Sequence, residues 1–330
     1  MKKICLMMAV ALMAAAACSK NEADRSENNV NSFSVKMVQP VGDADTKTAF
    51  VLDNGKYNKL VWSAGDKLYV TRGSETSHDG TKRYATYTID AGGSTEGTFS
   101  LTDGEIPKGS GKYLAFYTAP LDVSGGSYYG HVVNAPTHHL QAAIPSMQTY
   151  VENGIQQYGM PMYGVGDDLD HLTFYLLGNV LRFNLYNGGS DVIKIKSIKL
   201  STTAGTGASN GIAGAFAFVE DDVNGKNPVD AFGIWATTSV NHMGTCEITY
   251  SCGSGVALST DSANPTVFNT VVSRRHSGGD SDITARFTFT VNDGTEQYKD
   301  VVLTNLTQTK RAALGKIYSF PAKDASTFFF

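Results

Sequence analysis

The chain has 330 residues with 27 basic and 31 acidic side chains, a formal net charge of −4, and no run of five or more lysines and arginines. This balance gives no basis for nucleic-acid binding, which depends on neutralising phosphates. Charged residues make up 18% of the chain, below the ~25% of average soluble domains, whereas glycine occurs 34 times. The composition indicates strands and turns, and the length suits two domains of about 150 residues each.

The first seventeen residues have the pattern of an export signal. Two lysines form a basic start, and residues 4–14 form an apolar run that is too short to cross a bilayer, for which ~20 residues are needed. Alanines at 15–17 precede Cys18, and small residues directly before a cysteine resemble the lipobox of a lipoprotein signal peptidase. The sequence predicts a signal peptide over residues 1–17 and lipidation of Cys18; an ordinary secretory signal ending near a cysteine is the alternative.

Residues 18–31 form a charged stretch that is poor in apolar residues. Such a stretch cannot bury enough surface to fold, so we interpret it as a lipidated tether. It resembles the acidic stretches that send lipoproteins of Bacteroides-type bacteria to the cell surface. Loss of residues 1–17 removes two basic and no acidic groups, which makes the net charge about −6. We therefore expect a surface-exposed lipoprotein held in the outer membrane by its lipid anchor.

Strand signals begin at Phe33 and continue to residue 186. Apolar and polar residues alternate in short runs between glycine, aspartate and proline, a pattern typical of half-buried strands. The segment 121–166 is rich in glycine, proline and polar residues, so we expect an ordered connection there, followed by a strand pair over 171–186. The strands expected in this half are 33–38, 59–70, 84–89, 97–101, 113–118, 171–175 and 180–186.

A second series of strands follows a break at residues 187–190. The first of them, 192–200, alternates apolar residues with lysines and has a slip or bulge near Ser197. Strands then recur about every 10 residues, which favours a sandwich over alternating strands and helices. One short helical piece is expected near 307–314. The later strands are expected at 213–219, 232–237, 246–251, 266–272, 283–291, 297–303 and 317–320.

Together these signals predict an all-β protein with two sandwich domains in tandem. The composition break after residue 188 marks the boundary between them. The predicted parts are the signal peptide 1–17, the tether 18–31, an N-terminal β-sandwich domain 32–188 and a C-terminal β-sandwich domain 189–330.

Of the four cysteines, Cys5 lies in the expected signal peptide and Cys18 is the expected lipid anchor, which leaves Cys246 and Cys252. An exported protein permits them to form a disulfide. In one extended strand their Cα atoms would lie ~20 Å apart, beyond the ~7 Å limit of a disulfide. A bridge therefore requires a turn between them, whereas residues 247–250 alternate like a strand, and the sequence leaves both arrangements open.

Short motifs follow one another in a characteristic order, at 46–50, 61–70, 97–99, 113–117, 144–149, 171–185, 211–216 and 315–318. In this order they resemble the fimbrillin family, the subunits of the type V pili of Bacteroidales. The resemblance covers nearly the whole exported chain. It implies two transthyretin-like β-sandwich domains, lipoprotein export, and a fimbrial subunit, structural or accessory, that supports adhesion.

The resemblance also implies polymerisation by exchange of strands between subunits. A sheet that has lost a strand exposes backbone groups and apolar pockets, which a neighbour's strand can satisfy. The candidate exchanged strand carries Phe33, Val35 and Met37. In the family, assembly follows cleavage after a basic residue, usually arginine. Here the candidate processing sites are Lys47, in the loop after this strand, and Arg25, before it.

Three phenylalanines, Phe328, Phe329 and Phe330, end the chain. An exposed apolar end without a partner favours aggregation. We therefore expect this tail to occupy a groove, either in its own C-terminal domain or in the next subunit.

No constellation of an enzyme or a metal site can be named. Asp167, Asp168 and Asp170 could offer oxygen ligands to calcium, but the segment lacks the glycine and distal glutamate of an EF-hand loop, and we interpret it as a solvated turn. We expect no catalytic residue, cofactor or metal; the expected partners are other fimbrial subunits, the membrane and a host or bacterial surface ligand.

We interpret Trp62 as a core residue and Gly65-Asp66 as a bend that leads into residues 68–70. The alternative is a monomeric glycan-binding lipoprotein in which Trp62, Trp235 or clustered tyrosines stack on sugar rings.

Overall fold

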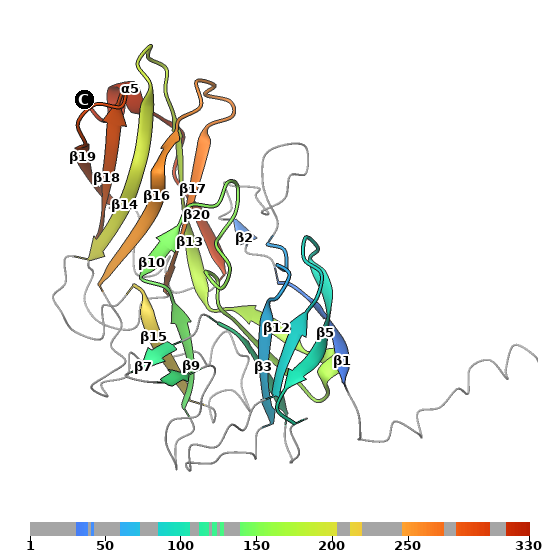
Figure 1. Cartoon of the computed structure of the whole chain (residues 1–330). Coiled ribbons are helices and arrows are strands. Elements are labelled where there is room, and N and C mark those ends of the chain that lie inside the picture. The colour runs from blue at the N-terminus through green and yellow to red at the C-terminus, as the bar shows by residue number, and fades with distance from the viewer. Residues whose placement is uncertain are drawn as a thin grey trace, which may run out of the picture. The chain divides into compact units, whose positions relative to one another are not determined.

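The chain folds almost entirely into β-strands, as Figure 1 shows, which confirms the all-β prediction. The computed structural model describes residues 31–38, 41–42, 60–72, 85–105, 112–118, 121–123, 126–128, 139–202, 212–219, 246–273, 282–303 and 315–330. The predicted strand at 232–237 and the helical piece at 307–314 lie outside these residues.

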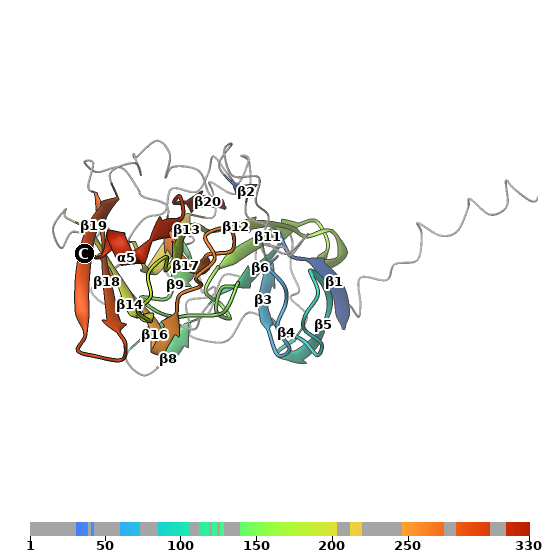
Figure 2. The same cartoon turned by 90° about the horizontal axis from the view of Figure 1, so that it is seen from above.

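The largest sheet has seven strands, and every neighbouring pair in it is antiparallel. Figure 2 shows β1 at its edge beside β5. Aromatic and β-branched side chains from these strands fill the core beneath the sheet, as expected for a pleated, half-buried surface. The strands, in their order across the sheet, are β1 (Ser32–Lys36), β5 (Glu96–Asp103), β4 (Ala85–Ile89), β3 (Lys67–Arg72), β6 (Tyr113–Tyr117), β11 (Met162–Gly166) and β12 (Thr173–Leu176).

The strand expected over 59–70 begins only at Lys67, because a tight turn precedes it. The backbone N–H of Ser63 donates to Asp66 Oδ2 at 2.7 Å, and the N–H of Asp66 donates to the Ser63 carbonyl at 3.0 Å. Gly65 adopts φ +81° in this turn, a value that favours glycine. The extended strand in the prediction was therefore wrong before Lys67, whereas the bend expected at Gly65 and Asp66 is confirmed.

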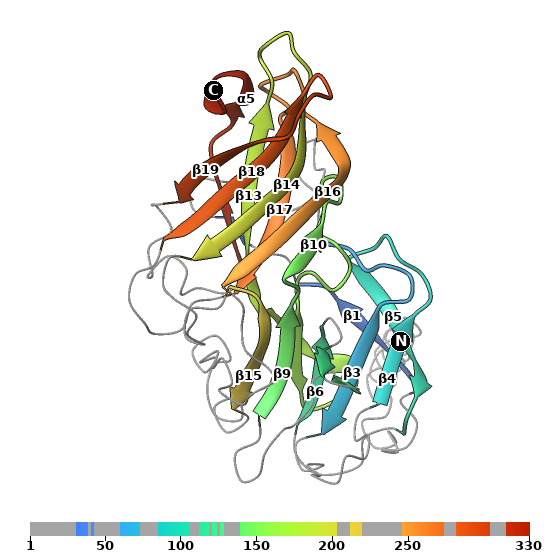
Figure 3. The same ribbon diagram turned by 60° about the vertical axis from the view of Figure 1, so that its left-hand side comes forward.

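A second sheet has five strands, which run side by side in Figure 3. The pairing shifts register between Ile195 and Ser197 on both sides of the strand that holds them, which confirms the bulge predicted near Ser197. The strand at one edge pairs in parallel with its neighbour. In order, the strands are β10 (Met147–Thr149), β16 (Glu247–Ala257), β14 (Ile193–Thr202), β18 (Ile283–Val291) and β19 (Gln297–Leu303).

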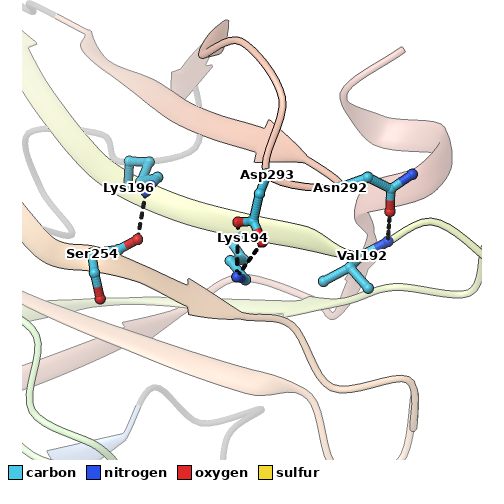
Figure 4. Close-up of polar contacts among 6 residues, drawn as sticks. All are labelled: Val192, Lys194, Lys196, Ser254, Asn292 and Asp293. Atoms are coloured by element: carbon cyan, nitrogen blue, oxygen red, sulfur yellow. Dashed lines mark hydrogen bonds and ion pairs between the residues drawn. The ribbon is translucent and has the colours of Figure 1, made fainter.

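The connection from β18 to β19, residues 292–296, opens with a tight turn that also contacts the start of β14. Asn292 and Asp293 have φ of +48° and +56°, and positive φ at both central positions characterises a type I′ turn. The Asn292 Oδ1 accepts the backbone N–H of Val192 at 2.8 Å, and Lys194 Nζ lies 2.8 Å from Asp293 Oδ1 (Figure 4). The turn therefore ties the end of β18 to the start of β14 through side-chain contacts.

The remaining strands form smaller sheets. One sheet has the order β17 (Thr266–Ser273), β13 (Gly178–Tyr186), β20 (Lys316–Ser319) and β2 (Val41–Gly42), and β21 (Lys323–Asp324) also pairs with β13. Two-stranded sheets join β15 (Gly214–Val219) to β9 (His139–Ile144) and β7 (Leu121–Val123) to β8 (Gly126–Tyr128). The helical turns are η1 (Leu169–His171) and α5 (Ala325–Phe328).

Two expectations for the middle of the chain were wrong. The supposed connection 121–166 contains the strands β7 to β11. The expected strand pair within 171–186 does not form either, because β12 pairs with β11 whereas β13 pairs with β17 and β20. Strands β2, β10 and β13 pair with strands that follow residue 188, and the division into two tandem domains at this residue stays a prediction.

One buried amide covers the free edge of β17. Gln148 is 3% exposed. Its Nε2 donates to the Val271 carbonyl at 2.7 Å and to the Pro145 carbonyl at 3.0 Å, while its Oε1 accepts the Val271 N–H at 2.9 Å and the Thr270 hydroxyl at 3.0 Å. The side chain therefore satisfies both backbone groups of an edge-strand residue, which would otherwise be buried without partners.

Replacing this amide tests its role. We expect Gln148→Ala to lower the free energy of unfolding by about 2–4 kcal/mol, because it leaves the Val271 N–H and C=O without partners at about 1–3 kcal/mol each. Gln297→Ala, at an exposed position of β19, is the matched control, with an expected change within about 0.5 kcal/mol. Urea unfolding followed by tryptophan fluorescence measures both, and equal effects of the two substitutions would contradict this role.

Candidate strand-exchange site

The strand predicted at 33–38 forms as β1, and its two faces differ sharply. Phe33, Val35 and Met37 are 2%, 3% and 4% exposed, whereas Ser34 and Lys36 face solvent. The alternation arises because successive side chains of a strand point to opposite faces of the sheet. One face of β1 is therefore part of the core, although the strand lies at the edge of its sheet.

Aromatic rings surround the buried face of β1. The Phe33 ring lies edge-on to Tyr87, with centroids 4.8 Å apart, and stacks on Phe99 at 6.3 Å. Trp62 meets Phe99 edge-on at 4.9 Å, and its Nε1 donates to the Val35 carbonyl at 3.2 Å. The indole thus contributes both apolar contact and a hydrogen bond to the same strand.

The position of Trp62 decides between two readings of the sequence. The residue is 1% exposed, so its ring offers no surface on which a sugar could stack. Its interpretation as a core residue is confirmed, and a glycan platform built on Trp62 is excluded. Trp235, the other tryptophan considered for such a platform, lies outside the described residues.

Strand β1 is held by one neighbouring strand. Its five residues pair antiparallel with β5, from Ser32 opposite Ser100 to Lys36 opposite Glu96, and the Met37 N–H adds a bond to Thr95 at 2.7 Å. Burial of an apolar side chain of this size contributes about 1.5–3 kcal/mol. Loss of β1 would therefore expose an apolar groove and the unpaired backbone of β5, a surface that another strand can fill.

A buried carboxylate fixes the turn that carries Trp62. Asp66 is fully buried, and its Oδ1 accepts the Tyr117 hydroxyl at 3.2 Å and Gln157 Nε2 at 2.7 Å. The Tyr117 oxygen in turn accepts the backbone N–H of Tyr158 at 3.0 Å. Burial raises the pKa of Asp66 above its ordinary value of 3.8, and the hydrogen bonds from Ser63, Gln157 and Tyr117 oppose this rise. Burial also raises the pKa of Tyr117 strongly.

The C-terminal tail packs on its own chain. Phe329 is 6% exposed and stacks on Phe289 with centroids 4.4 Å apart, while Phe328 meets Phe287 edge-on at 6.3 Å. Phe330 is 69% exposed. Figure 1 shows α5 beside β18, the strand that holds Phe287 and Phe289. The tail therefore packs against β18 of its own chain.

A carboxylate locks the start of this tail. Asp324 caps α5 by accepting the Ser326 N–H at 3.0 Å, and it also accepts the Gly188 N–H at 2.9 Å. These hydrogen bonds to Gly188 and Ser326 lower the pKa of Asp324 below 3.8. A Cβ at Gly188 would lie 2.4 Å from Asp324 Oδ2, so the close approach requires glycine.

The residues predicted for lipidation, processing and a disulfide are reported next. Cys18, Arg25 and Lys47 lie outside the described residues, so lipidation and processing there stay predictions. Cys252 lies within β16 and forms no disulfide with Cys246; burial raises the pKa of its thiol to about 12.

The acidic turn before β12 shows no metal-binding geometry. Asp168 bonds His171 Nδ1 at 2.7 Å, and Leu169 between them is buried. Within the described ranges, no group of three or more His, Cys, Asp or Glu side chains could hold a metal ion. In the same ranges, the helices are too short or too polar to cross a membrane.

The sequence did not predict the residues that support this site through partners far away in the chain. Gln148 and Gln157 lie in the segment 121–166, for which the sequence predicts a connection, and their partners Val271 and Asp66 are 123 and 91 residues away. The spacing of residues along the sequence does not predict hydrogen-bonded pairs that lie so far apart in the chain. The one available signal was Asp66 directly after Gly65, which marks a turn but not its partner.

Comparison with known proteins gives a limited result. No family model and no curated protein matches the chain. Among solved structures, a "putative cell adhesion protein" from Bacteroides uniformis matches with 16% identity, covers 80% of this chain and 88% of its own, and has a TM-score of 0.37. A protein of the same description from Bacteroides eggerthii matches with 12% identity, 91% and 89% coverage, and a TM-score of 0.35. TM-scores this low do not establish a shared fold, so no property is transferred from these proteins.

The buried carboxylate predicts a pH dependence. Because the pKa of Asp66 is raised in the folded protein, folded chains hold the proton more tightly than unfolded ones. This contribution to stability is fully present below pH 3.8 and is lost as the pH rises through the raised pKa. We expect the unfolding free energy of the wild type, minus that of Asp66→Asn, to fall as the pH rises in urea titrations.

Asp293 provides a control of opposite sign. Lys194 lowers the pKa of this exposed carboxylate, so the corresponding difference for Asp293→Asn should increase as the pH rises. The same trend with pH for both variants would contradict the assignment to Asp66.

The tail predicts a contrast between neighbouring phenylalanines. Phe329→Ala should lower the free energy of unfolding by about 3 kcal/mol, because it removes a buried ring from the contact with Phe289. Phe330→Ala, at the exposed end, should change it by less than about 1 kcal/mol. Thermal and urea unfolding measure both values; a tail that packs only against other subunits would give no loss at Phe329 in dilute monomer.

Proposed function

We propose that this chain is a fimbrillin-like surface lipoprotein, a structural or accessory subunit of a pilus that assembles by strand exchange and supports adhesion. The observation that carries the proposal is the state of β1, an edge strand with one face entirely in the core and a single neighbouring strand. Such a strand can leave as a unit, and it would leave an apolar groove beside the unpaired backbone of β5.

The first step of the proposed assembly is cleavage after Lys47. Residues 32–36 and 41–42 form β1 and β2, and both strands lie at sheet edges. A cut at Lys47 would leave them attached only by noncovalent contacts, which include the backbone pairing with β5 and β20 and the side-chain contacts of β1 with Trp62 and Tyr87. Two edges, rather than one, would then be open to a strand from a neighbouring copy of this chain.

The second step is replacement of the lost strand. The groove requires apolar side chains at alternate positions, because Phe33, Val35 and Met37 fill it in this way. It also requires backbone groups that pair with β5 over Glu96–Ser100. Only another extended segment satisfies both requirements, so exposure of the groove favours polymerisation over a stable open monomer.

The membrane anchor completes the proposal. Lipidation at Cys18 would hold the uncleaved chain at the outer membrane through the tether 18–31, and cleavage at Lys47 would release the remainder into a fibre. Cleavage at Arg25 would free the chain from its lipid without detaching β1. The two processing sites therefore predict different products.

Limited digestion tests the proposal on the chain from Ser19 onward. A lysine-specific protease should produce a new N-terminus at Thr48, and size-exclusion chromatography should then show a ladder of oligomers. Val35→Ala should speed the appearance of the ladder, because it weakens the contact of β1 with the core by about 1–2 kcal/mol. Ser34→Ala, on the exposed face, is the matched control, and Lys47→Ala should suppress both the cut and the ladder.

The same experiment can reject the proposal. A product that starts at Thr48, has lost β1 and remains monomeric would contradict strand exchange. A ladder that forms equally fast in Val35→Ala and the wild type would show that departure of β1 is not a step in assembly.

A further inference from the structure

A polar pocket lies beside β13, β16 and β17, and the proposed assembly gives it no role. Its volume is ≈ 490 Å³, and its walls come from the segment after β10, from β13, and from the turn that joins β16 to β17. The size falls in the range of about 300–1,000 Å³ that small-molecule sites occupy.

One wall is a turn held by its own side chains. Asp261 accepts the backbone N–H of Ala263 at 2.8 Å and the Asn264 amide at 2.6 Å. Across the base of the turn, the Ser259 N–H donates to Thr266 Oγ1 at 2.8 Å. Ala263, Asn264 and Thr266 all line the pocket, so this wall is formed before any ligand binds.

The floor presents an oriented amide. Asn184 of β13 donates through Nδ2 to the Phe320 carbonyl at 2.6 Å and to Ser319 Oγ at 3.0 Å. These bonds fix which end of the amide is the donor, and no described residue donates a hydrogen bond to its Oδ1. The side chain therefore brings a fixed acceptor to the pocket.

The opposite wall combines an aromatic ring with polar groups. Tyr150 is held between Phe268, at 5.5 Å between ring centroids, and Tyr250, at 6.5 Å. Glu152 and Asn153 follow it, and Asn153 has φ +53°, a left-handed conformation that asparagine tolerates better than most residues. The backbone of this wall is tied down by a hydrogen bond from Asn269 Nδ2 to Gly154 at 3.2 Å.

The charges around the pocket limit the ligand class. Among the described residues that line it, Glu152 is the one acidic side chain, and no lysine, arginine or histidine contributes. An anionic ligand would meet this carboxylate with no cation in the lining to offset the repulsion. A single carboxylate also falls short of the several oxygen ligands that a divalent cation requires.

We propose that this pocket binds a neutral saccharide of about one or two sugar rings. Amides, hydroxyls and one carboxylate match the paired donor and acceptor roles of sugar hydroxyl groups, and the Tyr150 ring adds an apolar contact. The site is distinct from the tryptophan platform considered from the sequence, and it does not depend on strand exchange.

Saturation-transfer NMR on the chain from Ser19 onward tests this site. The probes are the methyl glycosides of glucose, galactose and mannose, with glucuronic acid as the acidic comparison. We expect at least one neutral glycoside to bind with a millimolar dissociation constant and glucuronic acid to bind more weakly. Glu152→Gln should weaken binding by about tenfold through loss of a charge-assisted hydrogen bond, whereas Glu296→Gln, at an exposed site away from the pocket, should leave it unchanged.

A second pair of variants tests the location without depending on hydrogen bonds. Ala263→Trp places a large ring in the pocket and should abolish binding, whereas Thr260→Trp, in the same exposed turn but outside the lining, should not. Equal thermal unfolding midpoints of the two variants establish that both are folded. Absence of binding by every glycoside, or unchanged binding in Ala263→Trp, would overturn the proposal, as would glucuronic acid binding as tightly as the neutral sugars.

Discussion

The structure depends on how its sheet edges are closed. An edge strand carries backbone groups that cost free energy when they are buried without a partner. At β5 the partner is a whole strand, β1. At β17 it is a single side chain, since Gln148 bonds both backbone groups of Val271. These closures differ in permanence, because β1 can leave once the chain that follows it is cut, whereas a glutamine inside β10 cannot leave without breaking the pairing of β10 with β16.

The sequence predicted local features better than the pairing of distant strands. The bulge at Ser197, the alternation of Phe33 and Val35, and the core position of Trp62 follow from spacing and residue type, and the structure confirms them. Gln148 shows why the rest was missed. Alternation would place the apolar Met147 inside and Gln148 outside, yet Met147 is 65% exposed and Gln148 is 3% exposed. The buried amide is stable only because a strand more than 120 residues later supplies its partners.

The candidate strand-exchange site also combines features that the sequence predicts with features that it does not. Its apolar face could be predicted, because period-2 alternation is a property of one segment. The residues that support the site could not be predicted, because Asp66 accepts hydrogen bonds from Tyr117 and Gln157, which come from separate parts of the chain. The two ends of the described chain also differ in chemistry. Strand β1 is held by a sheet edge and an indole, whereas the tail is held by the stacking of Phe329 on Phe289 and by the Asp324 cap.

The five consecutive pairs between β1 and β5 have a mechanical consequence. A force directed along β1 acts on all of these pairs together, so they must rupture almost simultaneously, whereas a force across the strand separates them one at a time. The Trp62 hydrogen bond adds a fixed point at Val35, near the end of the strand. Lifetimes under tension follow the rate of unfolding rather than the equilibrium free energy. A strand bound in this groove would therefore resist lengthwise pulling far longer than its modest length suggests, yet it would peel readily from either end.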